Sequence, residues 1–152
     1  MKSFQDYFPD DVAICYGCGR NNPKGLHIKS YWENDVGVCR FLPEPHHTAF
    51  PGVVYGGLIA SLIDCHSICT AMAHACRIEH RDMEKELDVY YVTGELKVRF
   101  LKPTPTETEI VLRAHISEFT DKKSNVKCSV FANNIETARA DVLAIRVSSY
   151  RS

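Results

Sequence analysis

One stretch of the chain is apolar on almost every face of a helix, and runs of alternating apolar and polar residues lie on both sides of it. The stretch is LIASLIDCHSICTAMAHAC, residues 58–76, which is rich in Ala, Leu and Ile and too long for one strand. A helix that is hydrophobic all round must be enclosed by the rest of the protein. The pattern therefore predicts a buried central helix that carries a single carboxylate, Asp64.

The alternating runs have the period of two that is typical of strands. Before the helix, two such runs surround a short break at residues 33–35 and predict a hairpin. The predicted strands are residues 26–32, 36–42, 89–101, 110–116, 126–132 and 135–147. Between the last two, Asn133 and Asn134 form a dipeptide that tolerates the positive φ of a tight turn.

Successive antiparallel strands favour one curved sheet with a face that needs covering, and the central helix is the element that can cover it. We therefore expect an α+β fold in which a curved antiparallel sheet wraps around one long central helix. The expected domain is single and spans residues 1–152, with residues 1–14 as a loosely ordered lead-in and residues 77–88 as a charged, exposed connection. One helix seldom covers such a sheet alone, so we expect a homodimer.

Charge and composition exclude some partners. The 152 residues carry a formal net charge of −1 with a sequence pI near 6.6, which gives no general reason to expect nucleic acid or an anionic membrane. A local basic patch for a phosphorylated ligand is compatible with this balance. Asp64, His66 and His74 would each be costly in hydrocarbon, so we do not expect the helix to span a membrane.

Cysteine usage and the first residues bear on the compartment. The seven cysteines lie mostly in apolar runs, which is typical of small buried side chains in a reducing compartment. The opening MKSFQDYFPDD has no apolar core of the signal-peptide type. These observations predict a cytoplasmic protein.

The start of the central helix carries the strongest indication of chemistry. Gly56 and Gly57 lie where the helix begins, and the open N-terminus of a helix offers free backbone N–H groups to a developing oxyanion. Asp64 can act nearby as a base or a nucleophile, because a carboxylate in an apolar helix is costly unless it is paired or used. The glycines also permit close packing, and the two roles are compatible.

A metal site is not expected from these spacings. Cys15 and Cys18 have the separation of a zinc-binding pair, for which His27 or Cys39 would have to supply further ligands. No second pair of this kind exists in the sequence. The histidines at residues 46–47 lack the helical spacing of a zinc protease.

Two longer strings resemble a known family. HHTAFPGVVYGGLIASLID, residues 46–64, and TGELKVRFLKPTP, residues 93–105, resemble the hot-dog fold acyl-CoA thioesterases of the PaaI-like type. In that family an Asp follows the first glycine of the pair by eight residues, as Asp64 follows Gly56. CYGCGRNNPKGL, residues 15–26, is similar to the start of one branch, and the resemblance covers most of residues 15–148.

The resemblance implies roles for three residues and a substrate class. Gly56 would bind the thioester oxygen through its N–H, Asp64 would be the catalytic carboxylate facing the partner subunit's oxyanion site, and Thr93 would help to hold the attacking water. The implied substrate is an acyl-CoA, which would be hydrolysed without a cofactor or metal. The implied assembly is a homodimer with sites at the subunit interface, or a dimer of dimers.

The resemblance also implies substrate-binding positions, some with unusual residues. His47 matches the first His of the family string, and Gly57 the second glycine. Thr48 stands at the usual Gln and Tyr55 at the usual His, whose place the Tyr55 hydroxyl could fill as a donor. These replacements keep open a non-hydrolytic acyl-CoA-binding module. A hot-dog hydratase or dehydratase is the less favoured alternative, because its chemistry needs a His there.

Overall fold

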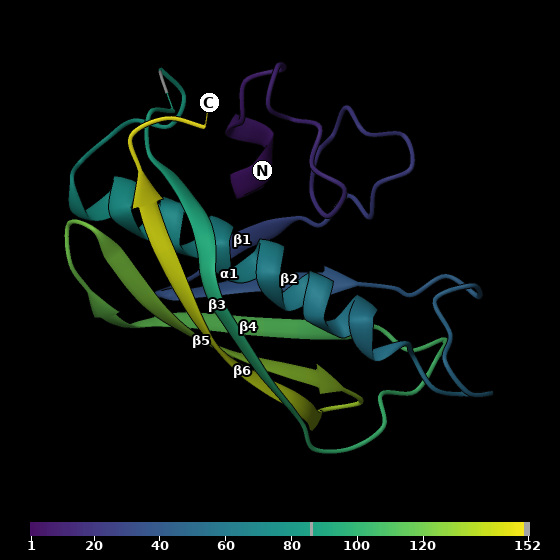
Figure 1. The fold of residues 1–152 in the computed structure, drawn as a ribbon. Helices are drawn as coiled ribbons and strands as arrows, with labels where there is room; N and C mark the ends of the chain where they lie inside the picture. Colours follow the sequence, from purple (N-terminus) through teal and green to yellow (C-terminus); the bar gives the residue numbers. More distant parts are fainter. Residues whose placement is uncertain (86, 151–152) are drawn as a thin grey trace.

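A long helix lies against one face of a six-stranded sheet, as Figure 1 shows for this computed structural model, which describes residues 1–85 and 87–150. The sheet is antiparallel throughout, with strand order β1-β2-β4-β5-β6-β3. The elements are η1 (Phe4–Tyr7), β1 (Ser30–Glu33), β2 (Val36–Phe41), α1 (Gly56–Ile78), β3 (Tyr90–Phe100), β4 (Ile110–Phe119), β5 (Lys123–Ala132) and β6 (Ile135–Val147). The α+β fold predicted from the hydrophobic pattern is confirmed.

Helix α1 is the centre of the hydrophobic core and packs against all six strands. It extends the predicted helix by two residues at each end, and Leu62 and Ile63 are completely inaccessible to solvent. By length and composition alone α1 could cross a membrane, but 61% of its most apolar window is buried inside the fold. The all-round apolar character of its sequence is thus explained by enclosure in the sheet.

The hairpins follow the predicted breaks, with differences at the first strand and at the turn between β4 and β5, where the strands extend to Phe119 and from Lys123, three residues beyond each predicted end. Asn133 and Asn134 both adopt positive φ, of 52° and 61°, in the turn between β5 and β6. The first strand begins at Ser30 rather than at residue 26. The preceding backbone is used in turns instead, because the N–H of Leu26 donates to Tyr16 O at 2.8 Å and that of Ile28 to Gly17 O at 3.0 Å.

The expectation of a loosely ordered lead-in is wrong. Ser3, Phe4 and Gln5 are buried, and the ring of Phe4 lies 5.1 Å from that of Trp32 in β1. The segment is too short to show a period of its own, and its partners lie far away in the sequence. We call residues 1–28, which pack over α1 and β1, the N-terminal segment (Figure 1).

The charged connection expected at residues 77–88 is ordered at its start by the helix and by an ion pair. Helix α1 continues to Ile78, and Arg146 of β6 forms an ion pair with Glu79. Position 86 of that connection, like residues 151–152 of the expected domain, lies outside the described residues.

Strand β3 forms one edge of the sheet and has β6 as its sole neighbour among the described strands. It is 11 residues long, and its Val92 and Phe100 are 48% and 56% exposed. A long edge strand with exposed apolar side chains is a ready template for pairing with another chain. This edge runs beside the residues of the candidate site.

Candidate active site

Asp64 is held by α1 and oriented by β3. It lies two turns into the helix, is half-buried, and its Oδ1 accepts a hydrogen bond of 2.5 Å from Thr93 Oγ1. The register of β3 against β6 shifts between Thr93 and Glu95, and such bulges re-aim side chains. Within residues 1–85 and 87–150 no other hydrogen bond reaches this carboxylate, so its second oxygen is available to a ligand or water.

The Asp64–Thr93 pair opens on a cavity of about 300 Å³. The N-terminal segment and β3 supply most of its apolar wall: Phe8, Val12, Ala13, Tyr91 and Val92. A carboxylate at the wall of an apolar cavity can act as a base or nucleophile on a ligand whose apolar part fills the space.

The start of α1 offers free donors. Gly56 is the first helical residue, and the N–H groups of Leu58 and Ile59 already donate to Tyr55 O. The N–H groups of Gly56 and Gly57 have no partner in the part of the chain that the structure describes. They lie at the positive end of the helix dipole, where an oxyanion is stabilised. Gly56 also lines a separate cavity of about 390 Å³ beside Phe100 and Lys102.

Tyr55 covers the outer side of the helix start. A Cβ placed on Gly57 would lie 2.5 Å from Tyr55 Cε2 and 2.9 Å from its hydroxyl oxygen, so the absence of a side chain at Gly57 lets the ring rest there. Tyr55 is 58% exposed, and its side chain forms no capping bond to the helix. Its hydroxyl therefore lies close to the free backbone donors.

Asp64 and the Gly56 amide do not meet within one chain. Eight residues along a helix correspond to about 12 Å, and the two groups open into different cavities. One thioester group can contact both only if a second chain brings its own helix start to the Asp64 cavity. Within one chain, Asp64 and Thr93 thus form one group. Gly56, Gly57 and Tyr55 form a second group at the start of the helix.

His47 and Thr48 lie in the loop that precedes α1. The Nδ1 atom of His47 accepts a hydrogen bond of 3.0 Å from the N–H of Glu44, and the ring faces a cavity of about 460 Å³ separate from that of Asp64. Partial burial and the neighbouring His46 lower the pKa of His47, which favours its neutral ring. The Thr48 hydroxyl lies 3.2 Å from the carbonyl oxygens of both Phe50 and Val53, where it stabilises the loop. Their predicted contact with substrate stays a prediction.

The sequence interpretation missed a group of thiols at the same cavity. Cys15, Cys18, Cys65 and Cys69 all line it. Hydrogen bonds from the other three thiols hold the pKa of Cys18 far below its usual value. Cys65 and Cys69 are four residues apart and so share a helix face, which is a signal that the sequence carried.

Similarity to known proteins places the chain in a family. The model of the thioesterase superfamily matches residues 51–142, which include Gly56, Asp64 and Thr93. The chain belongs to the thioesterase superfamily. This superfamily domain is similar to a crystal structure of a thioesterase superfamily protein from Shewanella loihica. The two are 36% identical, the match covers 92% of this chain and 99% of the other, and the TM-score is 0.69.

Two further relatives of this thioesterase-superfamily chain are more distant. It is 23% identical over 108 residues to the acyl-coenzyme A thioesterase THEM4 of Rattus norvegicus, a match that covers 71% of this chain and 41% of the relative. The chain thus spans about two fifths of the length of that curated protein. The PaaI protein from the phenylacetic acid degradation operon of E. coli shares the fold, with 12% identity, 80% coverage of both chains and a TM-score of 0.65. This fold is the PaaI-type hot-dog architecture that the sequence strings predicted.

Proposed function

We propose that the protein hydrolyses an acyl-CoA thioester to a free acid and CoA. The observation that carries the proposal is the Asp64 carboxylate, which Thr93 orients at 2.5 Å beside an apolar cavity. Membership of the thioesterase superfamily and likeness to an acyl-coenzyme A thioesterase support the reaction class. The apolar wall of the cavity suits an acyl chain.

In the proposed reaction, one subunit supplies the carboxylate and its partner supplies the oxyanion site. The thioester carbonyl oxygen accepts the N–H of the partner's Gly56, where the helix dipole stabilises the developing negative charge. Asp64 removes a proton from water as the water oxygen attacks the carbonyl carbon. The C–S bond then breaks, and the proton returns to the thiolate to give CoA.

Direct attack by Asp64 is the alternative route. The carboxylate oxygen would then form a mixed anhydride with the acyl group, release CoA thiolate, and be regenerated by water. Thr93 supports either route because its hydroxyl fixes one oxygen of the carboxylate and leaves the other free. A thiolate is a good leaving group, so neither route requires a strong general acid.

A homodimer would complete the site. The exposed edge of β3 ends at Phe100, which borders the cavity of Gly56 and lies 3.5 Å from a Cβ built on that glycine. Thr93 on the same strand borders the cavity of Asp64. Pairing of two chains along this edge would cover the apolar side chains of β3 and join the two cavities across the interface.

The first prediction concerns the carboxylate. We expect Asp64→Asn to lower kcat about 10²–10⁴-fold on a panel of acyl-CoAs read out by free thiol, because the amide cannot accept the proton. Binding of the acyl-CoA, measured by calorimetry, should persist. Asp141→Asn is the matched control, since Asp141 is an exposed carboxylate of β6 that pairs with Lys127 of β5.

Three outcomes would contradict the proposal. Binding of acyl-CoA by the wild type without thiol release would indicate the non-hydrolytic module instead. A change in ultraviolet absorbance on an enoyl-CoA without thiol release would indicate a hydratase. Full activity of Asp64→Asn would remove Asp64 from the mechanism.

A further inference from the structure

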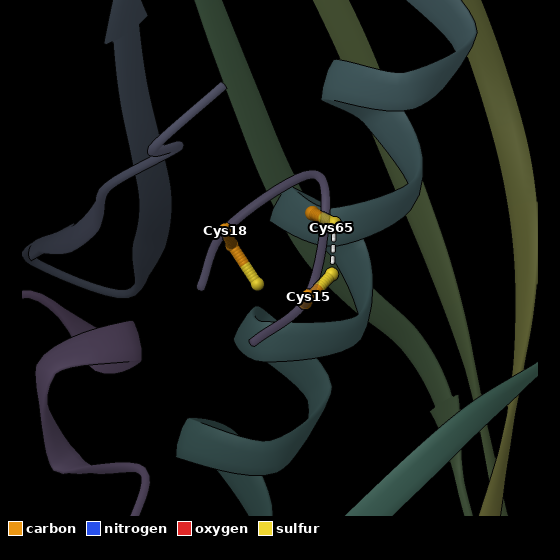
Figure 2. Close-up of side chains that lie close together, drawn as sticks. All are labelled: Cys15, Cys18 and Cys65. Atoms are coloured by element: carbon orange, nitrogen blue, oxygen red, sulfur yellow. Dashed lines mark hydrogen bonds between the residues drawn. The ribbon is translucent and has the colours of Figure 1, made fainter. Parts of the chain in front are cut away.

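Three cysteines from distant parts of the chain lie close together, as Figure 2 shows. All three line the Asp64 cavity. Cys15 and Cys18 lie on a turn of the N-terminal segment, and Cys65 lies on α1. Their sulfur atoms all lie within 4.8 Å of one another, and those of Cys15 and Cys65 are 3.8 Å apart. The thioesterase reaction proposed above has no use for these thiols.

The spacing of the sulfur atoms fits a tetrahedral metal site. Zinc binds thiolate sulfur at about 2.3 Å, so two sulfurs of a tetrahedral site lie about 3.8 Å apart. The distance between Cys15 Sγ and Cys65 Sγ equals this edge. Sets of thiolates in a tetrahedral arrangement favour Zn²⁺ among the common divalent ions.

The turn that carries Cys15 and Cys18 is shaped to press against the helix. A Cβ on Gly17 would lie 2.3 Å from Cys65 Sγ, so only glycine lets the turn approach that sulfur. A Cβ on Gly19 would lie 2.4 Å from the backbone nitrogen of Cys15, so this glycine lets the chain close tightly. Both glycines thus serve the convergence of the thiols.

Cys69 is placed to supply a fourth ligand. It follows Cys65 by one helical turn, so both side chains leave the same face of α1. It is 2% exposed and lines the same cavity, next to the three sulfurs that lie within 4.8 Å of one another. The two further ligands considered from the sequence are occupied elsewhere, since His27 Nε2 hydrogen-bonds Asn22 O at 2.6 Å and Cys39 is buried in β2.

We propose that Cys15, Cys18, Cys65 and Cys69 bind one Zn²⁺ that fastens the N-terminal segment to α1. Each thiol loses its proton to solvent as its sulfur binds the metal. Four protein ligands close the coordination sphere, so the ion has a structural role and leaves no position for a substrate. Bound there, the ion fixes the part of the Asp64 cavity wall that the N-terminal segment supplies.

Metal content of the full-length protein is the direct test. We expect about one zinc per chain by mass spectrometry after expression with zinc and desalting. Cys15→Ser and Cys18→Ser should lose most of it, whereas Cys76→Ala should retain it. Cys76 is a matched control because it is a buried cysteine of the same helix that lies outside the cluster.

Cobalt substitution counts the thiolate ligands. Co²⁺ added to chelator-treated wild type should give a sulfur-to-cobalt charge-transfer band, and Cys69→Ser should weaken the band by about a quarter. Adding Zn²⁺ should bleach it. Zn²⁺ should also raise the thermal midpoint of the chelator-treated wild type and leave that of Cys15→Ser unchanged, with circular dichroism to verify that the variant is folded.

Two results would overturn the zinc site. One is wild-type protein that contains no metal and gives no charge-transfer band with Co²⁺. The other is a disulfide between Cys15 and Cys65 in protein prepared without oxidant, which would assign the pair to redox chemistry. None of these measurements depends on thioester hydrolysis, so they stand apart from the test of Asp64.

Discussion

At Gly56 the backbone, rather than a side chain, is the group proposed to meet the substrate. The preceding residue, Tyr55, has φ −58° and ψ 127°, the extended conformation that a residue before proline adopts. Proline is well tolerated at the first position of a helix, where its missing N–H breaks no helical bond. A Cβ at position 56 would meet Phe100 at 3.5 Å, an ordinary contact.

Two substitutions at Gly56 therefore separate the amide from the space around it. We expect Gly56→Pro to lower kcat about 10²–10³-fold, equivalent to about 2.7–4 kcal/mol, because it removes one oxyanion donor. Gly56→Ala keeps the N–H and should stay within a few-fold of wild type. Steady-state kinetics on an acyl-CoA test this, and equal activity of the two variants would exclude the amide from the site.

The sequence predicted the positions of single site residues where these residues lie close together in the sequence. The eight-residue step from Gly56 to Asp64 lies within one helix, so the pattern alone placed both. Thr93 needed the family resemblance. Gly94 indicates the bulge beside Thr93, but no local signal indicates that Thr93 contacts Asp64 across 29 residues of sequence. The approach of Cys65 to Cys15 spans 50 residues, and alternation of apolar residues does not encode such a partner.

A buried polar network links four elements beneath the N-terminal segment. Gln5 of η1 donates to Ser30 Oγ at 2.9 Å, and Ser30 Oγ lies 2.8 Å from His66 Nδ1 in α1. His66 Nε2 lies 3.0 Å from Gly37 O in β2. These partners assign a neutral ring that accepts at Nδ1 and donates at Nε2. Complete burial lowers the pKa of His66 to about 4.

This network predicts a loss of stability in acid. The unfolded chain binds a proton on His66 below its usual pKa of about 6.5, whereas the folded chain binds it only near pH 4. The free energy of unfolding should therefore fall as the pH falls from about 6.5 to 4, by up to about 3 kcal/mol from this residue. Urea unfolding at pH 7 and pH 4 measures the effect.

His66→Gln is the reference for that experiment because it does not titrate. The stability advantage of the wild type over the variant should shrink across this pH interval, while the carboxylates, common to both, cancel. A constant advantage would contradict the neutral assignment of His66.

Helix α1 and strand β2 touch where a side chain is missing. A Cβ on Gly37 would lie 2.5 Å from Thr70 Oγ1 and 2.8 Å from its Cγ2, so the strand rests directly on the helix there. Thr70 is fully buried and its hydroxyl donates to His66 O at 2.7 Å. The contact fixes the distance between the helix and this part of the sheet.

We expect Gly37→Ala to cost about 1–3 kcal/mol of unfolding free energy through overpacking against Thr70. In a Thr70→Ala background the same change should cost much less, since the clashing atoms are gone. Urea denaturation of the two single variants and the double variant gives the coupling. Additive effects of the two substitutions on the free energy of unfolding would show that the backbone at Gly37 moves away, so that the added methyl group does not clash with Thr70.

At the level of elements, the central helix and the strands along the chain were predictable because their periods extend over many residues. The position of β3 at the sheet edge beside β6 was not predicted. The N-terminal segment was not predictable. Phe4 and Gln5 belong to a single short turn, and their burial depends on Trp32 and Ser30 of β1. Neither the period of the segment nor its composition indicates those partners.

At the scale of the whole molecule, Gly56 and Asp64 are about 12 Å apart on one helix, and this separation means that two chains must form the proposed site together. If the site is shared between chains, a dimer of one Asp64→Asn chain and one Gly56→Pro chain contains one intact site and one doubly defective site. Equal mixtures form such dimers half of the time.

Mixing the two inactive variants should therefore restore about a quarter of the wild-type thiol release. Co-expression with two affinity tags, followed by the free-thiol assay, measures the recovery, and each variant alone is the control. Absence of recovery in confirmed mixed dimers would place both groups of a site in the same chain.

Part of the wall of the Asp64 cavity comes from Phe8, Val12 and Ala13, which precede the region matched by the superfamily at residues 51–142. The Asp64 carboxylate and some of the residues that shape its cavity thus belong to different segments of the chain. Selection can remodel the dimensions of that space by altering the first 28 residues while leaving the reactive groups untouched. Grafting these residues between relatives would transfer preference for ligand size without transferring chemistry.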